Sequence, residues 1–256
     1  MITRYRASLG NVQLDSLDDR IAILDISYPP MDFSEKTFAT ADMDGYDTGD
    51  THYEKRTVVI TFELHVYNTA ERNALCQKVN EWARNGGSLR TSDRSGQYLY
   101  VKCESPASIE SVRDWTAPLT ITFSTARTPF WLSDSEKTVT VSGKNAKGTL
   151  KMDGNIRSAL VSVTVTAIDQ IKAIQVSVGK TNLKLTGLSV AIGQKIVIDY
   201  VRSRYLRIRA NGVSVMSKLN ASSTDNLRAD CGADSSVSVI SDGRANAVFS
   251  GRGLWM

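Results

Sequence analysis

Hydrophobic positions alternate most regularly over residues 57–67, where every second residue is apolar. The apolar face carries Val58, Ile60, Phe62, Leu64 and Val66, and the opposite face is mainly polar. A period of two is typical of a strand with one buried face. The pattern therefore predicts a β-strand over these residues and places its large side chains in a core.

The pattern changes to a helical period immediately after this strand. Asn68 is followed three residues later by Glu71, an arrangement that starts helices because both side chains satisfy free backbone N–H groups. The apolar stripe that follows consists of Leu75, Val79 and Trp82. We expect these three side chains to be buried against the sheet and Gly86-Gly87 to end the helix.

Three further strands are predicted around this pair, over residues 20–28, 98–103 and 119–124. Residues 37–53 show no period and contain Gly45 and Gly49, so they are predicted to form a loop. Pro129 should prevent the last strand from continuing, and the two aromatic residues after it can cover the end of a sheet.

The rest of the chain shows short alternating segments and no helical stretch. Strands are predicted at residues 159–166, 171–178, 183–186, 195–201, 205–210, 213–216, 236–240 and 247–250. Asn211-Gly212 predicts a two-residue hairpin turn, and Gly143, Asp153-Gly154 and Asp242-Gly243 are further turn signals. These patterns predict a mainly β protein, with residues 1–132 as a β-sandwich-like domain containing one α-helix and residues 133–256 as an antiparallel β-sandwich.

Composition limits the class of protein. With 256 residues and 41% apolar content the chain can form one or two domains with buried cores. No apolar run is long enough to span a membrane, and the first residues lack the apolar stretch of a secretory signal, so we expect folding in the cytosol. The cysteines Cys76, Cys103 and Cys231 are widely spaced, which favours reduced, mostly buried thiols over disulfides or zinc.

Charge is distributed unevenly between the two predicted domains. Residues 1–132 hold 14 Lys/Arg and 18 Asp/Glu, a net charge of −4, whereas residues 133–256 hold 17 and 9, a net charge of +8. Opposite charges can orient copies of the chain or a partner. Basic residues cluster only at Arg202, Arg204, Arg207 and Arg209. Since the last two alternate with apolar residues, a solvated strand face is favoured over a nucleic-acid site.

Catalytic and metal-binding patterns are not evident in the sequence. Of the two histidines, His65 lies on the polar face of a strand and His52 lies in the predicted loop without a nearby nucleophile motif. Alternating carboxylates from Asp42 to Asp50 could suggest calcium, but the Gly and Glu positions of an EF-hand loop are occupied by Asp47 and Tyr53. A solvated acidic loop is favoured, and we assign no catalytic, cofactor-binding or metal-binding residue.

The order of these elements resembles a known family. The segments are Ile23-Leu-Asp-Ile-Ser-Tyr28, Lys55-Arg-Thr-Val-Val-Ile-Thr-Phe-Glu-Leu64, a helix ending at Glu81-Trp82, Tyr98-Leu-Tyr-Val-Lys-Cys103, Pro129-Phe-Trp131 and the closing Phe249-Ser-Gly-Arg-Gly-Leu-Trp-Met256. Together they look like the distal tail proteins (Dit) of long-tailed phages and prophages of Gram-positive bacteria. The second half is similar to the galectin-like domain of that family.

The resemblance implies a structural role at the virion tail tip, after assembly in the cytoplasm of the host bacterium. Residues 1–132 would form the belt of a hexameric hub ring, and residues 133–256 would project as a galectin-like domain. The ring would join the tail tube to the tail-associated lysin and to receptor-binding or baseplate proteins, without a cofactor, a membrane or nucleic acid.

Two alternatives from other functional classes remain at this stage. A carbohydrate-binding module or adhesin that recognises the host surface would need exposed aromatic residues, and residues 133–256 contain a single Trp, Trp255, and no His. A tail tube protein would account for the first half alone. An enzyme is the least favoured class.

Overall fold

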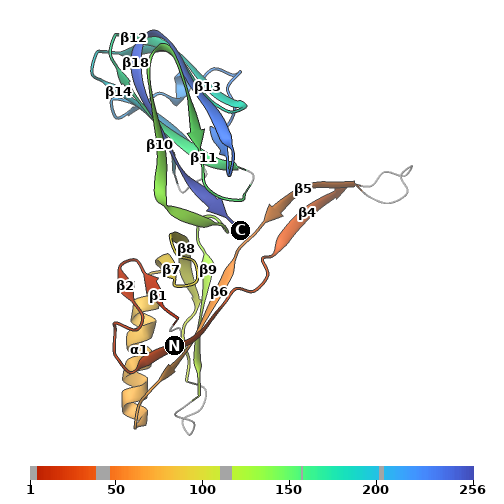
Figure 1. Cartoon of the computed structure of the whole chain (residues 1–256), viewed down its shortest axis with the longest axis vertical. Helices are drawn as coiled ribbons and strands as arrows, with labels where there is room; N and C mark the ends of the chain where they lie inside the picture. The colour runs from red at the N-terminus through yellow and green to blue at the C-terminus, as the bar shows by residue number, and fades with distance from the viewer. Residues whose placement is uncertain (1–4, 39–46, 110–116, 157, 202–204) are drawn as a thin grey trace. The chain divides into compact units, whose positions relative to one another are not determined.

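The computed structural model describes residues 5–38, 47–109, 117–156, 158–201 and 205–256. It divides into two compact units, Met1–Trp131 and Leu132–Met256 (Figure 1). Both are built almost entirely from antiparallel strands, and the described residues contain a single α-helix. The prediction of a mainly β protein with one helix is therefore confirmed.

The first unit is a seven-stranded antiparallel sheet with the helix packed against it. The sheet order is β2-β1-β7-β8-β9-β6-β3. The bounds are β1 Ala7–Leu9, β2 Val12–Gln13, β3 Ile21–Ser27, β6 Thr57–Leu64, α1 Thr69–Arg84, β7 Gly87–Thr91, β8 Gln97–Ser105 and β9 Leu119–Thr125. Burial alternates strictly along β6, as its sequence predicts, with Val58, Ile60 and Phe62 completely buried.

Helix α1 begins as the sequence predicts and ends slightly earlier. Asn68 is the N-cap, and its side chain accepts a hydrogen bond from the Glu71 N–H at 2.9 Å. The helix ends at Arg84, and Gly86 then adopts a positive φ of 61°. A Cβ on Gly86 would lie 2.3 Å from the Val101 carbonyl oxygen, so glycine is required there both for its conformation and for the close approach of β8.

The prediction that all three large residues of the stripe are buried was wrong for one of them. Leu75 and Val79 are buried, together with Cys76 and Ala83, but Trp82 is half-buried. Helical spacing specifies which residues share a face, whereas the rim of that face stays in contact with solvent. Trp82 lies at this rim, where its ring meets Phe123 edge-on at 6.0 Å.

Residues 37–53, predicted to be a loop, instead include most of a β-hairpin. Strands β4 (Phe33–Phe38) and β5 (Asp47–Tyr53) pair with each other as a separate two-stranded sheet. The hairpin is formed by backbone pairing and lacks the apolar alternation that identifies a strand in sequence. Asp42 and Asp44 lie outside the described residues, so the interpretation of the acidic loop stays a prediction.

The second unit is a β-sandwich in which the strands enclose one apolar core (Figure 1). Its elements are β10 Trp131–Lys151, β11 Ser158–Ala167, β12 Ile171–Val178, β13 Thr181–Val190, β14 Lys195–Val201, β15 Tyr205–Ala210, β16 Val213–Ser214, the 3₁₀ turn η1 Met216–Lys218, β17 Arg228–Asp230 and β18 Asp234–Trp255. One sheet has the order β16-β15-β14-β11-β18, and the other contains β13-β12-β18.

Strand β18 joins the two sheets, which corrects the predicted turn at Asp242-Gly243. Residues 237–241 pair with β12 and residues 245–251 pair with β11, so one continuous strand replaces the two predicted ones. At the crossing the Asp242 carboxylate accepts hydrogen bonds from the Lys172 and Ala173 N–H groups. Gly243 is needed because a Cβ would lie 2.4 Å from the Gln170 carbonyl oxygen.

Other turn signals of the second unit had mixed outcomes. Asn211 and Gly212 have φ values of 47° and 84° between β15 and β16, so the hairpin prediction is confirmed. Gly143 is assigned to β10 and has a positive φ of 140°. A Cβ on Gly143 would face Ala146 at 3.9 Å and one on Gly148 would meet Val141, so the chain reverses direction after Gly143 and this turn signal is confirmed. The strand predicted at residues 213–216 stops at Ser214 and continues into η1.

Candidate functional site

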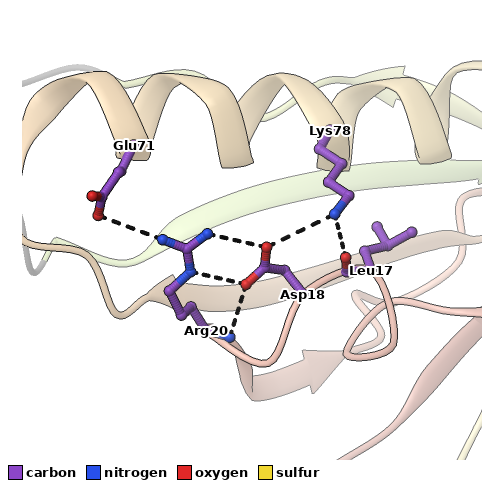
Figure 2. A network of polar contacts seen from close by, with 5 residues as sticks. All are labelled: Leu17, Asp18, Arg20, Glu71 and Lys78. Atoms are coloured by element: carbon purple, nitrogen blue, oxygen red, sulfur yellow. Dashed lines mark hydrogen bonds and ion pairs between the residues drawn. The ribbon is translucent and has the colours of Figure 1, made fainter.

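The connection between β2 and β3 is fastened to helix α1 by a chain of polar contacts (Figure 2). Arg20 forms a two-pronged ion pair with Asp18, at 2.9 Å from Nε and 3.2 Å from Nη2. Its Nη1 reaches Glu71 on the first turn of α1 at 3.5 Å. Lys78, two turns further along α1, donates to the Leu17 carbonyl and lies 3.8 Å from Asp18. We call these five residues the α1 clamp.

The clamp sets the protonation of its central carboxylate. The hydrogen bond from Arg20 holds the pKa of Asp18 well below its usual range, and the nearby Lys78 acts in the same direction. The same pair raises the pKa of Arg20. Both charges are therefore present at neutral pH, where they hold residues 17–20 against the helix.

Replacing Asp18 by Asn should destabilise the first unit in a pH-dependent way. Because the pKa of Asp18 is lower in the folded protein than its unfolded value of about 4, the clamp stabilises the fold above that pH and loses this contribution as the pH falls through the folded pKa. We expect Asp18→Asn to lower the melting temperature at pH 7, with the difference from wild type narrowing below about pH 4. A constant difference down to pH 2 would contradict this, and Asp225→Asn, which changes an exposed carboxylate of the second unit, is the control.

The last turn of α1 is held to the opposite end of the sheet. The Trp82 indole donates to the Val12 carbonyl at 3.0 Å, and its ring contacts Phe123 of β9. Helix α1 therefore contacts β2 through Trp82 and approaches β3 through the clamp. These contacts position both outer strands of the sheet.

A groove of about 750 Å³ follows one side of α1. It is lined mainly by polar helix side chains, and by Cys76, Cys103, Pro106 and Ile109. The Asn80 amide bonds both backbone groups of Ala107, at 2.8 and 2.9 Å, and so attaches the segment after β8 to the helix. Burial raises the pKa of the Cys76 and Cys103 thiols, so both are protonated at neutral pH.

The outermost strands of the two units differ in how their free sides are covered. Among the described residues β3 pairs only with β6, and a bulge between Ile23 and Asp25 leaves Leu24 40% exposed. In the second unit, by contrast, residues 219–224 run along β13. The Asn220 and Thr224 N–H groups donate to β13 carbonyls at 2.8 Å.

The covering of β13 also uses two hydroxyl groups. Ser223 Oγ accepts from the Lys184 N–H at 2.9 Å, and Thr224 Oγ1 accepts from the Asn182 N–H at 3.0 Å. The other sheet of this unit ends in β16, which has only two residues. Covered and very short outer strands are the usual protection of a sheet against pairing with another chain.

The basic residues of β15 are paired with a neighbouring carboxylate. Arg207 bonds Asp199 on β14 at 2.7 and 2.6 Å, and Arg209 reaches the same carboxylate at 3.2 Å. Arg202 and Arg204 lie outside the described residues. The pairing of Arg207 and Arg209 with Asp199 agrees with the predicted solvated strand face and not with a nucleic-acid site, because the carboxylate balances part of their charge.

The structure places the remaining sequence candidates apart from one another. The His65 side chain, directly after β6, is 61% exposed, and its Nε2 lies 3.1 Å from the Glu63 carboxylate. The side chain of His52 is not described. Within the described ranges no three His, Cys, Asp or Glu side chains come together as a metal site. All three cysteines are free. No helix in this part of the chain has the length and apolar character to cross a membrane.

These features define a class of protein: a two-unit, mainly β chain whose described residues include one clamped helix and an outer strand, β3, that is paired on one side. Residues 13–125 match the family model described as the phage tail protein RIFT-related domain. The first unit is therefore similar to this phage tail domain over most of its length, in agreement with the resemblance inferred from the sequence.

Solved structures extend the similarity to the whole chain. The Dit protein (gp 19.1) of phage SPP1, described as a paradigm of the hub adsorption apparatus of phages infecting Gram-positive bacteria, matches with a TM-score of 0.73 and 11% identity over 97% of this chain and 98% of that chain. The chain thus shares the fold of this Dit protein over nearly its whole length.

Weaker matches come from baseplates. A chain of the phage P2 baseplate in its activated conformation with Ca matches with a TM-score of 0.48 and 9% identity, over 99% of this chain and 98% of that one. The corresponding structure with Sr gives 0.45 and 8%, over 97% of each chain. A search of curated proteins found no match.

Proposed function

We propose that this protein is the hub subunit of a phage tail tip. Six copies form a ring through residues 1–132, and residues 133–256 project from the ring as a galectin-like domain. The ring joins the tail tube to the tail-associated lysin and to receptor-binding or baseplate proteins, in a virion assembled in the host cytoplasm. The role is structural and uses no catalytic residue, cofactor or metal.

The observation that carries this proposal is the combination of a phage tail domain in the first unit with the Dit fold over the full length. Two physical features support it. A closed ring of identical subunits needs two different surfaces that fit each other. Among the described residues, the outer strand β3 of the first unit is paired on one side only. The net charges of −4 and +8 in the two halves also give each copy a polarity for oriented docking.

An adhesin role of the second unit has less support. Carbohydrate sites commonly present aromatic rings to the solvent, whereas the Trp255 indole donates to Ser133 Oγ at 3.1 Å and Trp255 is half-buried on its own unit. The largest exposed aromatic surface among the described residues of this unit belongs to Tyr205, at 67% exposure.

The mass of the purified full-length protein tests the ring. We expect light scattering or native mass spectrometry to show a hexamer of the 28.1 kDa chain, and a fragment of residues 133–256 to remain monomeric. A full-length protein that stays monomeric at all accessible concentrations would refute the ring. If the fragment formed a hexamer by itself, the ring would form through the second unit, and its assignment to residues 1–132 would be wrong.

A further inference from the structure

Arg56, directly before β6, is a buried arginine of the first unit, with 6% of the residue exposed. Its Nε–H donates to the Pro129 carbonyl at 2.9 Å, and its backbone N–H donates to Thr125 Oγ1 at 3.0 Å. Within the described ranges its two Nη groups have neither a hydrogen-bond acceptor nor an ion-pair partner. A guanidinium that has lost most of its water and has no anion beside it is destabilising for the fold.

Two arginines of the second unit have the partner that Arg56 lacks, although they are far more exposed. The Arg207 side chain is 42% exposed and binds the Asp199 carboxylate through two N–H groups, at 2.7 and 2.6 Å. The Arg244 side chain is 62% exposed and binds Asp169 in the same way, at 2.9 and 3.1 Å. Exposed ion pairs contribute little because water already solvates both charges. Of these three arginines, Arg56 is therefore the one for which a missing anion costs most.

The surroundings of Arg56 add positive charge and a second donor without an acceptor. The Arg94 guanidinium lies 5.8 Å from the centre of the Tyr28 ring and 5.5 Å from the centre of the Trp131 ring. Burial, and then the charge of Arg94, lower the pKa of Arg56. The Trp131 indole N–H is buried and has no acceptor, and the Asp93 carboxylate accepts from the Tyr28 hydroxyl at 2.9 Å instead of pairing with Arg56. The groups left over at this end of the first unit are therefore donors.

We propose that Arg56 is a binding site for an oxyanion, a carboxylate or a phosphate group, of another molecule. A guanidinium presents parallel N–H groups that match two oxygens of such an anion, and the bond from Nε to the Pro129 carbonyl fixes the plane of this fork. Both Nη groups still reach the surface, so the anion can approach them. The site does not depend on the ring proposed above.

The melting temperature of the full-length protein in different anions tests the site. Sodium phosphate and sodium acetate, each compared with sodium chloride at equal ionic strength and pH, should raise the melting temperature of the first unit. The rise should be about 4–8 °C at ten times the dissociation constant. Arg56→Met should lose this response and should still melt close to wild type in chloride, because Met has a similar length and no charge to desolvate.

Arg127→Met is the matched control, because Arg127 is an exposed arginine of the same unit, stacked 3.9 Å above the centre of the Tyr100 ring. It should keep the full response to phosphate and acetate. Arg56→Lys keeps the charge but not the fork, so it should bind phosphate about tenfold or more weakly than wild type. Should Arg56→Met fail to fold, this loss of affinity decides the question, and an unchanged affinity of Arg56→Lys would overturn the proposal.

Phosphate also stabilises proteins by exclusion from their surface, so an equal rise in wild type and Arg56→Met would overturn the proposal. A wild-type protein that melts alike in all three salts would overturn it as well. Oligomer mass in chloride separates two sources of the oxyanion: Arg56→Met assembles as wild type does if a free ion fills the site, and about tenfold or more weakly if an acidic group of a neighbouring chain does. A monomeric wild type with an Arg56-dependent response would refute the ring and support this site.

Discussion

Phe62→Ala should destabilise the first unit by about 3–5 kcal/mol, because it removes a completely buried ring from the centre of β6 and leaves a cavity. This is a large part of the stability of a typical domain. We expect the first unit to melt at a much lower temperature and the full-length protein to lose its ring. Differential scanning calorimetry and native mass spectrometry measure the two effects.

The control for Phe62 is a ring of the same type in the same unit. Phe33 is 59% exposed at the start of β4, so Phe33→Ala should change the melting temperature of the unit much less. If Phe62→Ala melted like wild type but failed to assemble, Phe62 would have to be exposed in solution. The assignment of its face to the core would then be wrong.

Phe249→Ala should have an equally large effect on the second unit and little effect on assembly. Phe249 is completely buried where β18 pairs with β11 at Val163, so its removal should cost about 3–5 kcal/mol in that unit. Because the two units have separate cores, the melting transition of the first unit should be retained. We expect the oligomer mass at temperatures below both transitions to remain that of wild type.

Tyr205→Ala is the control for Phe249→Ala, and the oligomer mass of both variants shows whether the second unit is needed for the ring. Tyr205→Ala changes a 67% exposed ring of the same unit and should leave both melting transitions nearly unchanged. Loss of the ring in Phe249→Ala, with the first unit still folded, would show that the second unit contributes essential contacts. The assignment of the ring to residues 1–132 would then fail.

The spacing of apolar residues correctly predicted the strands that bury one face in a core and expose the other. Strand β6 and most strands of the second unit follow from alternation, because each buries one face and exposes the other. The capping side chain of Asn68 identified the start of α1 because a cap acts within one helical turn. These are local interactions, and the residues involved are neighbours in the sequence.

The elements that sequence reasoning missed depend on distant partners. The β4–β5 hairpin and β7 lack a clear apolar alternation, and they become strands through pairing with neighbouring backbone. The Asp242-Gly243 pair looked like a turn, yet β18 passes through it because Asp242 bonds the start of β12, some seventy residues earlier in the chain. Neither feature has a local signal.

The tertiary structure also decided which outer strands have a paired or covered side. The sequence by itself determined the mainly β class and the position of the helix, since these follow from the spacing of apolar residues and from chain-local capping. It could not show that β3 is the outer strand or that residues 219–224 cover β13, because the open side of a strand depends on which other segments pair with it. It likewise placed Trp82 on the correct face of α1, but only packing against Phe123 and Val12 set how deeply its ring is buried.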